Sequence, residues 1–158
     1  GAKVNVHGPE GIRELAVEDI HHSPGKTNLK AGEIVTSFSF PKKPAQSSDA
    51  YLRMIPRTEM DIAVVGCAVN ITMLEEKCID ARVALGAVAP TALLVEEAAN
   101  IIINSTLDEE TIKKASKACE DACNPIDDKR GTVAYRKKVS GVLFRRALQI
   151  AVDRTKKG

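Results

Sequence analysis

The chain has 158 residues and a formal net charge of +2, with 23 Lys and Arg against 21 Asp and Glu. Hydrophobic residues make up 44% and charged residues 28%, which is typical of a globular domain and excludes collagen-like, disordered and membrane-spanning classes. The balanced charge and an aromatic content of only 3%, without Trp, argue against a nucleic-acid partner, which needs a basic surface or stacking platforms.

Turn signals divide the first part of the chain into short strands. The clusters at residues 8–11 and 23–25 combine Gly with Pro, a composition typical of tight turns. The first cluster, Gly-Pro-Glu-Gly, is the nearest match to a phosphate-binding loop. Its proline removes a backbone donor and its glutamate repels phosphate, so we favour an ordinary turn.

The first part ends in a strand and a linker. Residues 34–40 place their larger apolar side chains on one side of an extended segment, which predicts a half-buried strand. Residues 41–48 follow with two prolines and a polar run, which cannot continue a central strand. We therefore predict a domain boundary near Gln46.

Two further segments have an apolar period of two residues. Residues 50–55 predict one strand, and residues 61–88 predict a long antiparallel hairpin that turns at residues 75–77, Glu-Glu-Lys. Three antiparallel strands are therefore expected in this part of the chain.

Beyond the hairpin the apolar period changes to about 3.6 residues, which is typical of helices. We predict a first helix from near Leu93, a second that begins with a capping box of Thr106 and Glu109, and a third over residues 134–155. Strands followed by helices, without βαβ alternation, predict an α+β fold. Its antiparallel sheet of about three strands would pack against about three helices.

The four cysteines are Cys67, Cys78, Cys119 and Cys123. They form no CxxC pair and have no histidine at metal-ligand spacing. We therefore expect small buried hydrophobic residues rather than ligands of a metal or cluster.

Three groups of polar residues admit a functional and a plain interpretation. Glu59 and Asp61 would share one side of a strand as an acid and base pair, although strand entries are commonly polar. His21 and His22 point to opposite sides of extended chain, which favours solvent exposure over a metal site. A solvated helix face is favoured over a binding patch for five basic residues: Arg136, Lys137, Lys138, Arg145 and Arg146. No catalytic or metal-binding residue is assigned.

Three motifs recur in order along the chain. They lie at residues 25–35, with Gly-Glu-Ile before a strand that ends in proline; at residues 51–65, with Tyr-x-Arg and Arg-x-x-x-Asp-Ile-Ala; and at residues 81–91, 125–131 and 135–137. In order and spacing they resemble the FAD-binding medium subunit of the molybdenum hydroxylases, the family of xanthine dehydrogenase and carbon monoxide dehydrogenase. The resemblance runs from about Val4 to Val152.

The resemblance implies a place in a redox assembly. Residues 1–45 are similar to the C-terminal end of the FAD-binding domain, and residues 46–158 to the flavoprotein C-terminal α+β domain. Its implied cofactor is FAD, which carries electrons to an external acceptor, with a molybdenum cofactor and 2Fe-2S clusters in partner subunits. The family's glycine-rich pyrophosphate loops have no counterpart in the sequence, so we expect this chain alone to be inactive.

Six positions match those near the flavin in the family: Lys26, Thr27, Val35, Arg53, Asp61 and Ile62. The resemblance implies that Val35 contacts the flavin through its backbone and side chain, and that Asp61 and Ile62 line the exposed side of the ring. A cation such as Arg53 near the ring would stabilise the anionic reduced flavin and raise its potential. Lys26 and Thr27 are further candidates in the preceding loop.

Two other functions stay open at this point. The chain could be a noncatalytic module whose helical face docks partner subunits, since no complete site is visible. Alternatively, the last helix could bind nucleic acid, in which case the affinity would fall steeply with salt. No secretory signal or apolar stretch of roughly 20 residues is present, so we expect a cytoplasmic protein without a membrane partner.

Overall fold

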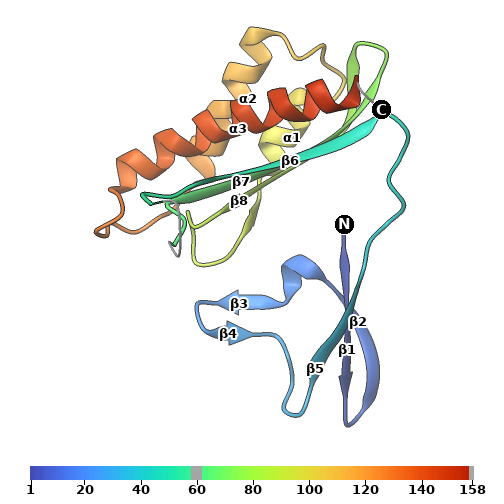
Figure 1. Cartoon of the computed structure of the whole chain (residues 1–158). Coiled ribbons are helices and arrows are strands. Elements are labelled where there is room, and N and C mark those ends of the chain that lie inside the picture. The colour runs from blue at the N-terminus through green and yellow to red at the C-terminus, as the bar shows by residue number, and fades with distance from the viewer. Residues whose placement is uncertain (58–61, 157–158) are drawn as a thin grey trace. The chain divides into compact units, whose positions relative to one another are not determined.

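In the computed structural model, residues 1–57 and 62–156 are described. The chain divides into two compact units, Gly1–Lys43 and Pro44–Gly158, here called the N-terminal and C-terminal units. Five strands belong to the first unit, and four strands with three helices belong to the second (Figure 1). Each unit is described by itself.

The N-terminal unit is a small antiparallel sheet with a two-stranded ribbon. The sheet has the order β2-β1-β5, from the strands β1 (Lys3–Gly8), β2 (Gly11–Ala16) and β5 (Ile34–Ser39). The ribbon pairs β3 (His21–Ser23) with β4 (Lys26–Thr27) after a short 3-10 turn, η1 (Val17–Asp19). The Gly-Pro-Glu-Gly cluster joins β1 to β2, where Gly8 pairs with Gly11, so the predicted turn is confirmed.

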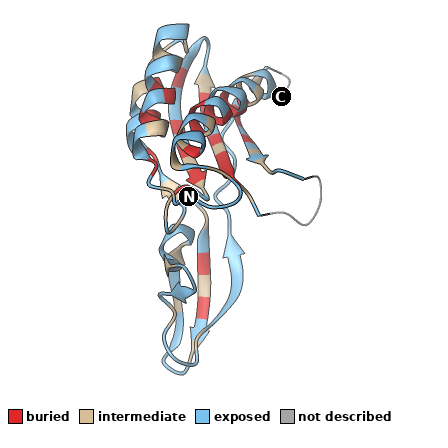
Figure 2. Cartoon of the chain, turned by 90° about the vertical axis from the view of Figure 1, so that its left-hand side faces the viewer, coloured by how far each residue is buried: buried red, intermediate tan, exposed pale blue. Residues whose placement is uncertain are grey.

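Little of the N-terminal unit is buried. Within residues 1–43, all of which are described, the fully buried hydrophobic residues are Val4 and Val6, both on β1 (Figure 2). Every residue of β5 is exposed, and Phe38 is 57% exposed. The prediction of a half-buried strand at residues 34–40 was therefore wrong in its burial, because no helix or second sheet covers this three-stranded sheet within the unit.

The C-terminal unit confirms the predicted α+β architecture. Its antiparallel sheet has the order β6-β7-β8-β9 and consists of β6 (Ser47–Met54), β7 (Val65–Leu74), β8 (Lys77–Gly86) and β9 (Leu93–Leu94). The helices α1 (Glu96–Ile102), α2 (Glu109–Ala122) and α3 (Val133–Thr155) lie together on one face of this sheet (Figure 1). None of the helices in the described residues is both long and apolar enough to cross a membrane.

Two predicted helix starts were wrong. Leu93 pairs with Leu85 in a fourth, short strand, and the amide of Val95 donates to the carbonyl of Val83 at 2.8 Å, so α1 begins only after this bond. The predicted capping box of Thr106 and Glu109 is replaced by Asp108, whose carboxylate accepts from the amide of Thr111 at 2.9 Å.

The core of the C-terminal unit lies between the sheet and the helices. Alternate residues of β7, including Cys67, Val69 and Ile71, face Phe144 and Leu148 of the same buried cluster. Buried residues of β6, β8, α1 and α2 complete this cluster. The hydroxyl of Ser48 also donates to the carbonyl of Ala151, which joins β6 to α3.

All four cysteines are buried, as predicted, and all four are free thiols. Burial raises the pKa of the Cys67 thiol to about 12 and that of the Cys78 thiol to about 11. Among the described residues no group of three or more His, Cys, Asp or Glu could hold a metal ion. These thiols therefore serve as apolar packing residues.

Candidate functional site

Three of the six candidate residues lie in the N-terminal unit. Val35 is on β5 opposite Val6 and is 37% exposed. Lys26 and Thr27 form the short strand β4, and both are exposed. The hydroxyl of Thr27 accepts a weak bond from the amide of Leu29 at 3.4 Å. The unit thus offers one fixed apolar side chain and a polar strand edge to a ligand.

An ion pair between Arg13 of β2 and Glu33, here called the clasp, lies two residues before Val35 along the chain. The Arg13 guanidinium donates from Nε and from an Nη to the two carboxylate oxygens of Glu33, both at 2.8 Å. The amide of Lys30 donates to the same carboxylate at 2.6 Å. These donors, the Arg13 side chain first and the Lys30 amide second, lower the pKa of Glu33 to about 2. Glu33 is therefore ionised at neutral pH.

The other three candidates belong to the C-terminal unit. Arg53 is an exposed residue of β6, and Ile62, which follows that strand, is 62% exposed. Asp61, together with the suggested acid and base pair of Glu59 and Asp61, lies outside the described residues. The pairing of these two carboxylates therefore stays a prediction.

Arg53 borders a shallow groove of about 460 Å³ between β6 and α3. Leu52, Met54 and Leu143 supply apolar walls, and Arg146 adds a second cation. An apolar floor with two guanidinium groups suits a flat, partly anionic group better than a cation.

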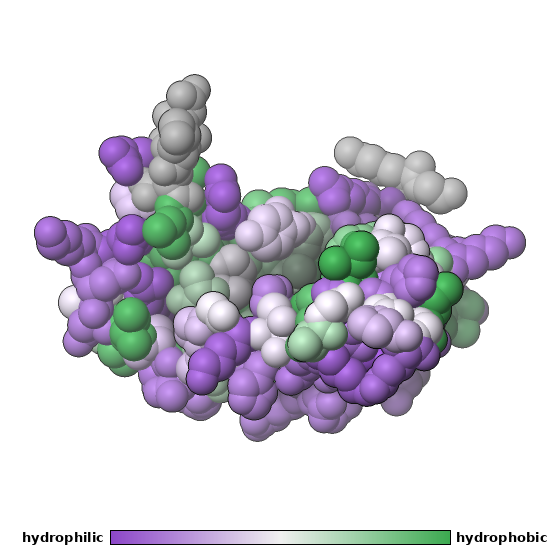
Figure 3. Space-filling model, turned by 90° about the horizontal axis from the view of Figure 1, so that it is seen from below, coloured by the Kyte–Doolittle hydropathy of each residue, from purple (hydrophilic) through white to green (hydrophobic). Residues whose placement is uncertain are grey.

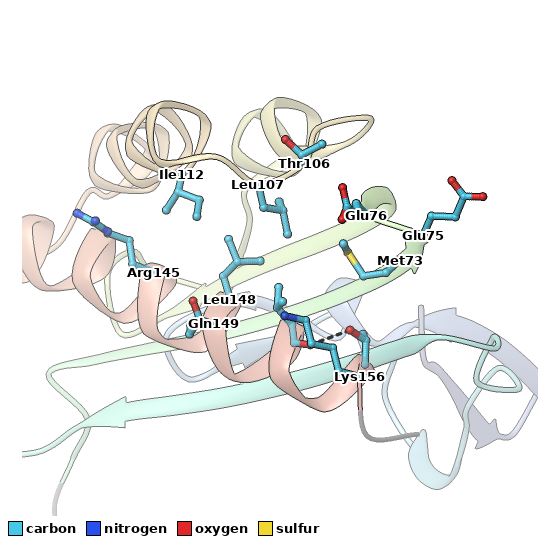
Figure 4. A pocket seen from close by; sticks show the side chains of 12 residues that line it. Met73, Glu75, Glu76, Thr106, Leu107, Ile112, Arg145, Leu148, Gln149 and Lys156 are labelled. Carbon is cyan, nitrogen blue, oxygen red and sulfur yellow. Dashed lines mark hydrogen bonds between the residues drawn. The ribbon is translucent and has the colours of Figure 1, made fainter.

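A second hollow, of about 410 Å³, also lies beside the C-terminal half of α3, between this helix, the end of β7 and the start of α2. Figure 4 shows Leu107 and Ile112 pointing toward Leu148, with Met73 beside them and Glu75 at the rim. The hollow mixes carboxylates with Arg and Lys and contains none of the six candidate residues. Its chemistry therefore points to no particular ligand.

Arg136 was predicted to lie on a solvated helix face, and this was wrong. It is 4% exposed and donates to the carbonyls of Val64 at 2.6 Å and Ala87 at 3.2 Å, and to the carboxylate of Asp128 at 2.7 Å. Three separate connections of the C-terminal unit are joined by this one side chain. The spacing of the sequence could have indicated this burial, because Arg136 lies seven residues before the buried Leu143 and therefore on the same helix face.

Asp128 receives bonds from several donors besides Arg136. The backbone amide of Arg130 donates to it at 2.8 Å, and the Arg130 guanidinium lies 3.2 Å from its second oxygen. These bonds, the Arg130 amide first and the Arg136 side chain second, lower the pKa of Asp128 to about 2. The loop before α3 is thereby held by an ionised carboxylate.

Most of the C-terminal unit matches a known family. Residues 50–151 match the family model of the CO dehydrogenase flavoprotein C-terminal domain. The matched segment includes the candidate residues Arg53, Asp61 and Ile62, along with the groove beside Arg53 and the Arg136 contacts.

Curated relatives extend the similarity to both units. The carbon monoxide dehydrogenase medium chain of Afipia carboxidovorans is 35% identical over 156 residues, which is 99% of this chain and 54% of the relative. The putative xanthine dehydrogenase FAD-binding subunit of Escherichia coli K12 is 27% identical over 96% of this chain and 52% of its own length. The chain therefore spans about half the length of the curated relatives it matches.

Solved structures give the same picture. Reconstituted CO dehydrogenase from Oligotropha carboxidovorans has a chain with a TM-score of 0.93 and 34% identity, covering 98% of this chain and 54% of that one. The CO dehydrogenase of Hydrogenophaga pseudoflava that lacks the Mo-pyranopterin moiety gives a TM-score of 0.93 at 29% identity, over 97% and 53%.

Proposed function

The chain belongs to the CO dehydrogenase flavoprotein C-terminal domain family, and from this premise we propose that it forms the C-terminal part of an FAD-binding medium subunit in a molybdenum hydroxylase. The observation that carries the proposal is the alignment of 99% of the chain with a CO dehydrogenase medium chain. In this proposal residues 1–45 end the FAD-binding domain, and residues 46–158 are the C-terminal domain.

FAD, when bound, supplies the redox chemistry that passes electrons from iron-sulfur clusters to an external acceptor. The residues of this chain fit the ring of FAD and not its phosphates. Val35 and Ile62 offer exposed apolar contacts, and Arg53 offers a cation in the groove beside β6. The positive charge of Arg53 would raise the reduction potential of the flavin, while Asp61, Lys26 and Thr27 complete the proposed set.

The turn between β1 and β2 supports the proposal that this chain contacts the flavin ring while another part of the subunit binds the phosphates. Its glutamate, Glu10, forms an ion pair with Lys30 at 2.8 Å, and Pro9 has no amide proton to donate. An anion of the size of a pyrophosphate finds no cradle there. We therefore assign the phosphates to the remainder of the subunit, so that this chain alone would be inactive.

Exposed apolar residues of the N-terminal unit also support the proposal, because the rest of an FAD-binding domain would cover them. Ile12 is 73% exposed, Ile34 is 64% exposed and Phe40 is 78% exposed, so large apolar side chains of this unit lie at its surface. Figure 3 shows hydrophobic residues (green) at the surface among hydrophilic ones (purple) on the face that it draws. In the proposal, the rest of the FAD-binding domain covers part of this apolar surface.

The partners follow from the same assignment. We expect a molybdenum-cofactor subunit and an iron-sulfur subunit in one cytoplasmic complex, with neither nucleic acid nor membrane as a partner. The alternative is a noncatalytic docking module, which would join such subunits without contacting flavin.

The test joins this chain to the N-terminal portion of the Afipia carboxidovorans medium chain and titrates FAD while flavin fluorescence is recorded. We expect the joined protein to bind FAD stoichiometrically, and this chain alone to bind it weakly or not at all. Failure of the joined, folded protein to bind FAD would contradict the proposal. A flavin-free complex with the partner subunits would instead favour the docking module.

A further inference from the structure

The entry of β5 is fixed by polar groups although the strand has almost no core. Arg13 of β2, Val6 of β1 and Val35 of β5 lie in one cross-strand row, because Val6 pairs with both of the others. Side chains in one such row share a face of the sheet. The bond from Arg13 to Glu33 therefore spans the sheet on the face of Val35, two residues before it.

The clasp is closely packed and cannot shift freely. The side chain of Glu33 is 8% exposed, whereas every residue of β5 is exposed. A methyl group added to Gly8 would come within 2.6 Å of Cγ of Glu33, so the β1–β2 turn closes directly against this side chain. Gly32, with φ of +79°, turns the chain into Glu33 with a backbone conformation that favours glycine.

A further contact holds the loop before the clasp. Arg13 also donates to the carbonyl of Asn28 at 3.0 Å, and the amide of Lys30 completes the ring of donors around Glu33. Residues 28–33 are thus tied to β2 at both of their ends. The Arg13 guanidinium donates two parallel bonds to the Glu33 carboxylate, and these bonds determine the path of the chain into Val35.

On the other side of Val35 the strand has a bulge. Asn5 pairs with Ser37 while Val6 pairs with Val35, so Thr36 is the extra residue in β5. The hydroxyl of Thr36 donates to the carbonyl of Asn5 at 3.1 Å, and the Asn5 amide group donates to Ser37 at 3.0 Å. A bulge re-aims the side chains beside it, and this one is pinned by side-chain bonds.

From these contacts we infer that Arg13 and Glu33 are positioning residues that hold Val35, through the backbone of β5, in the orientation in which it contacts the isoalloxazine ring. The inference rests on the proposed function. Neither charged residue contacts the flavin itself. They act by fixing the start of β5 on one side of Val35, while the bulge at Thr36 fixes the strand on the other side.

The first arm of the test uses the chain as it stands. Hydrogen exchange of the β5 peptide is compared between the parent and Glu33→Gln, which removes the charge and keeps the size. We expect exchange in β5 to become about tenfold faster. The peptide with Val4 and Val6 should change less, because β1 also pairs with β2, and the core of the C-terminal unit should stay unchanged. The matched control is Glu10→Gln, which removes the exposed pair with Lys30 from the same loop region and should leave β5 as it is.

The second arm measures FAD in the joined protein described above. Glu33→Gln should weaken FAD binding about tenfold and shift the flavin absorption band, whereas Glu10→Gln should do neither. Arg13→Lys keeps the charge without the fork and should give an intermediate loss.

The outcomes separate the two proposals. If the parent joined protein binds no FAD, the proposed function fails and this inference falls with it. If the parent binds FAD and Glu33→Gln binds it equally well, only the positioning role is overturned. If β1 exchanges as fast as β5 in Glu33→Gln, the clasp is a general support of the unit, which also overturns the positioning role.

Discussion

The two units differ in what holds their sheets together. The C-terminal unit packs its long strands and all three helices into one buried cluster, whereas the N-terminal unit buries only Val4 and Val6 among its hydrophobic residues. In the N-terminal unit, the ion pair of Arg13 and Glu33 and the bonds around Asn5 take the place of a core. Both sheets are antiparallel, so strand pairing alone does not explain the difference.

This difference in buried apolar area indicates that the two units obtain their stability from different interactions. A sheet covered by helices buries enough apolar area to fold by itself, while a bare three-stranded sheet is marginal in water. The N-terminal unit is therefore expected to need a partner surface, which the proposed function supplies.

Two phenylalanines compare the units directly. Phe144 is fully buried in the C-terminal unit, so Phe144→Ala should lower the free energy of unfolding by about 3–5 kcal/mol through lost burial and a cavity. Phe38 is 57% exposed, so Phe38→Ala should change it by less than about 0.5 kcal/mol in this chain. Urea unfolding followed by circular dichroism measures both. Equal losses in the two variants would show that the N-terminal unit has a core of its own.

A buried cation distinguishes the C-terminal unit further. Arg136→Met should cost about 3 kcal/mol, because the carbonyls of Val64 and Ala87 lose their donor in a buried site. Arg130→Met is the matched control, since Arg130 forms an ion pair with Asp128, as Arg136 does, but is more exposed. A loss in the control as large as in Arg136→Met would assign the effect to the carboxylate pairing alone. Thermal unfolding of both variants provides the measurement.

Acid should weaken both units through different carboxylates. The folded pKa values of Glu33 and Asp128 are about 2, below their ordinary values of 4.5 and 3.8. The stability that each ionised group contributes is therefore complete above about pH 4.5 and is lost as the pH falls toward 2. Glu33→Gln should reduce the acid response of the N-terminal unit, where the bond to Lys30 also lowers the pKa of Glu10, and should leave that of the C-terminal unit unchanged, as seen in NMR spectra recorded from pH 6 to pH 2. A loss of acid response in the C-terminal unit as well would contradict this separation.

The thiols report on the C-terminal unit alone. All four cysteines are buried there, and burial raises the pKa of each thiol, so iodoacetamide should leave the native chain nearly unlabelled at pH 7.5. Labelling should appear in mass spectra only at urea concentrations that unfold this unit. Rapid labelling of Cys67 in the native chain would contradict the packed core at β7.

The sequence predicted the parts of the fold that depend on periodicity. The hairpin of β7 and β8 and the length of α3 were recovered because their apolar residues repeat every two or every 3.6 residues. The start of α1 was missed because the pairing of Leu93 with Leu85 and the bond from Val95 to Val83 keep this segment in the sheet. Such a bond joins residues twelve apart and leaves no local pattern.

The candidate site was predictable only in part. The resemblance proposed Val35 and Arg53 as flavin contacts, and these stay predictions. Neither the alternation of β5 nor any spacing revealed the clasp of Arg13 and Glu33, whose members are twenty residues apart. Burial of β5 was overestimated since periodicity describes which residues share a face and says nothing of what covers that face. Arg136 was wrongly predicted to face solvent because its charge was taken as a sign of exposure, although its position falls on the apolar stripe of the helix.

The most direct measurement of the central claim is hydrogen exchange of the joined protein with and without FAD. We predict that FAD slows exchange in the peptides that contain Val35 and Arg53, and leaves α2 and the core of the C-terminal unit unchanged. Protection confined to the helices, or no protection at Val35 while FAD is bound, would contradict the account.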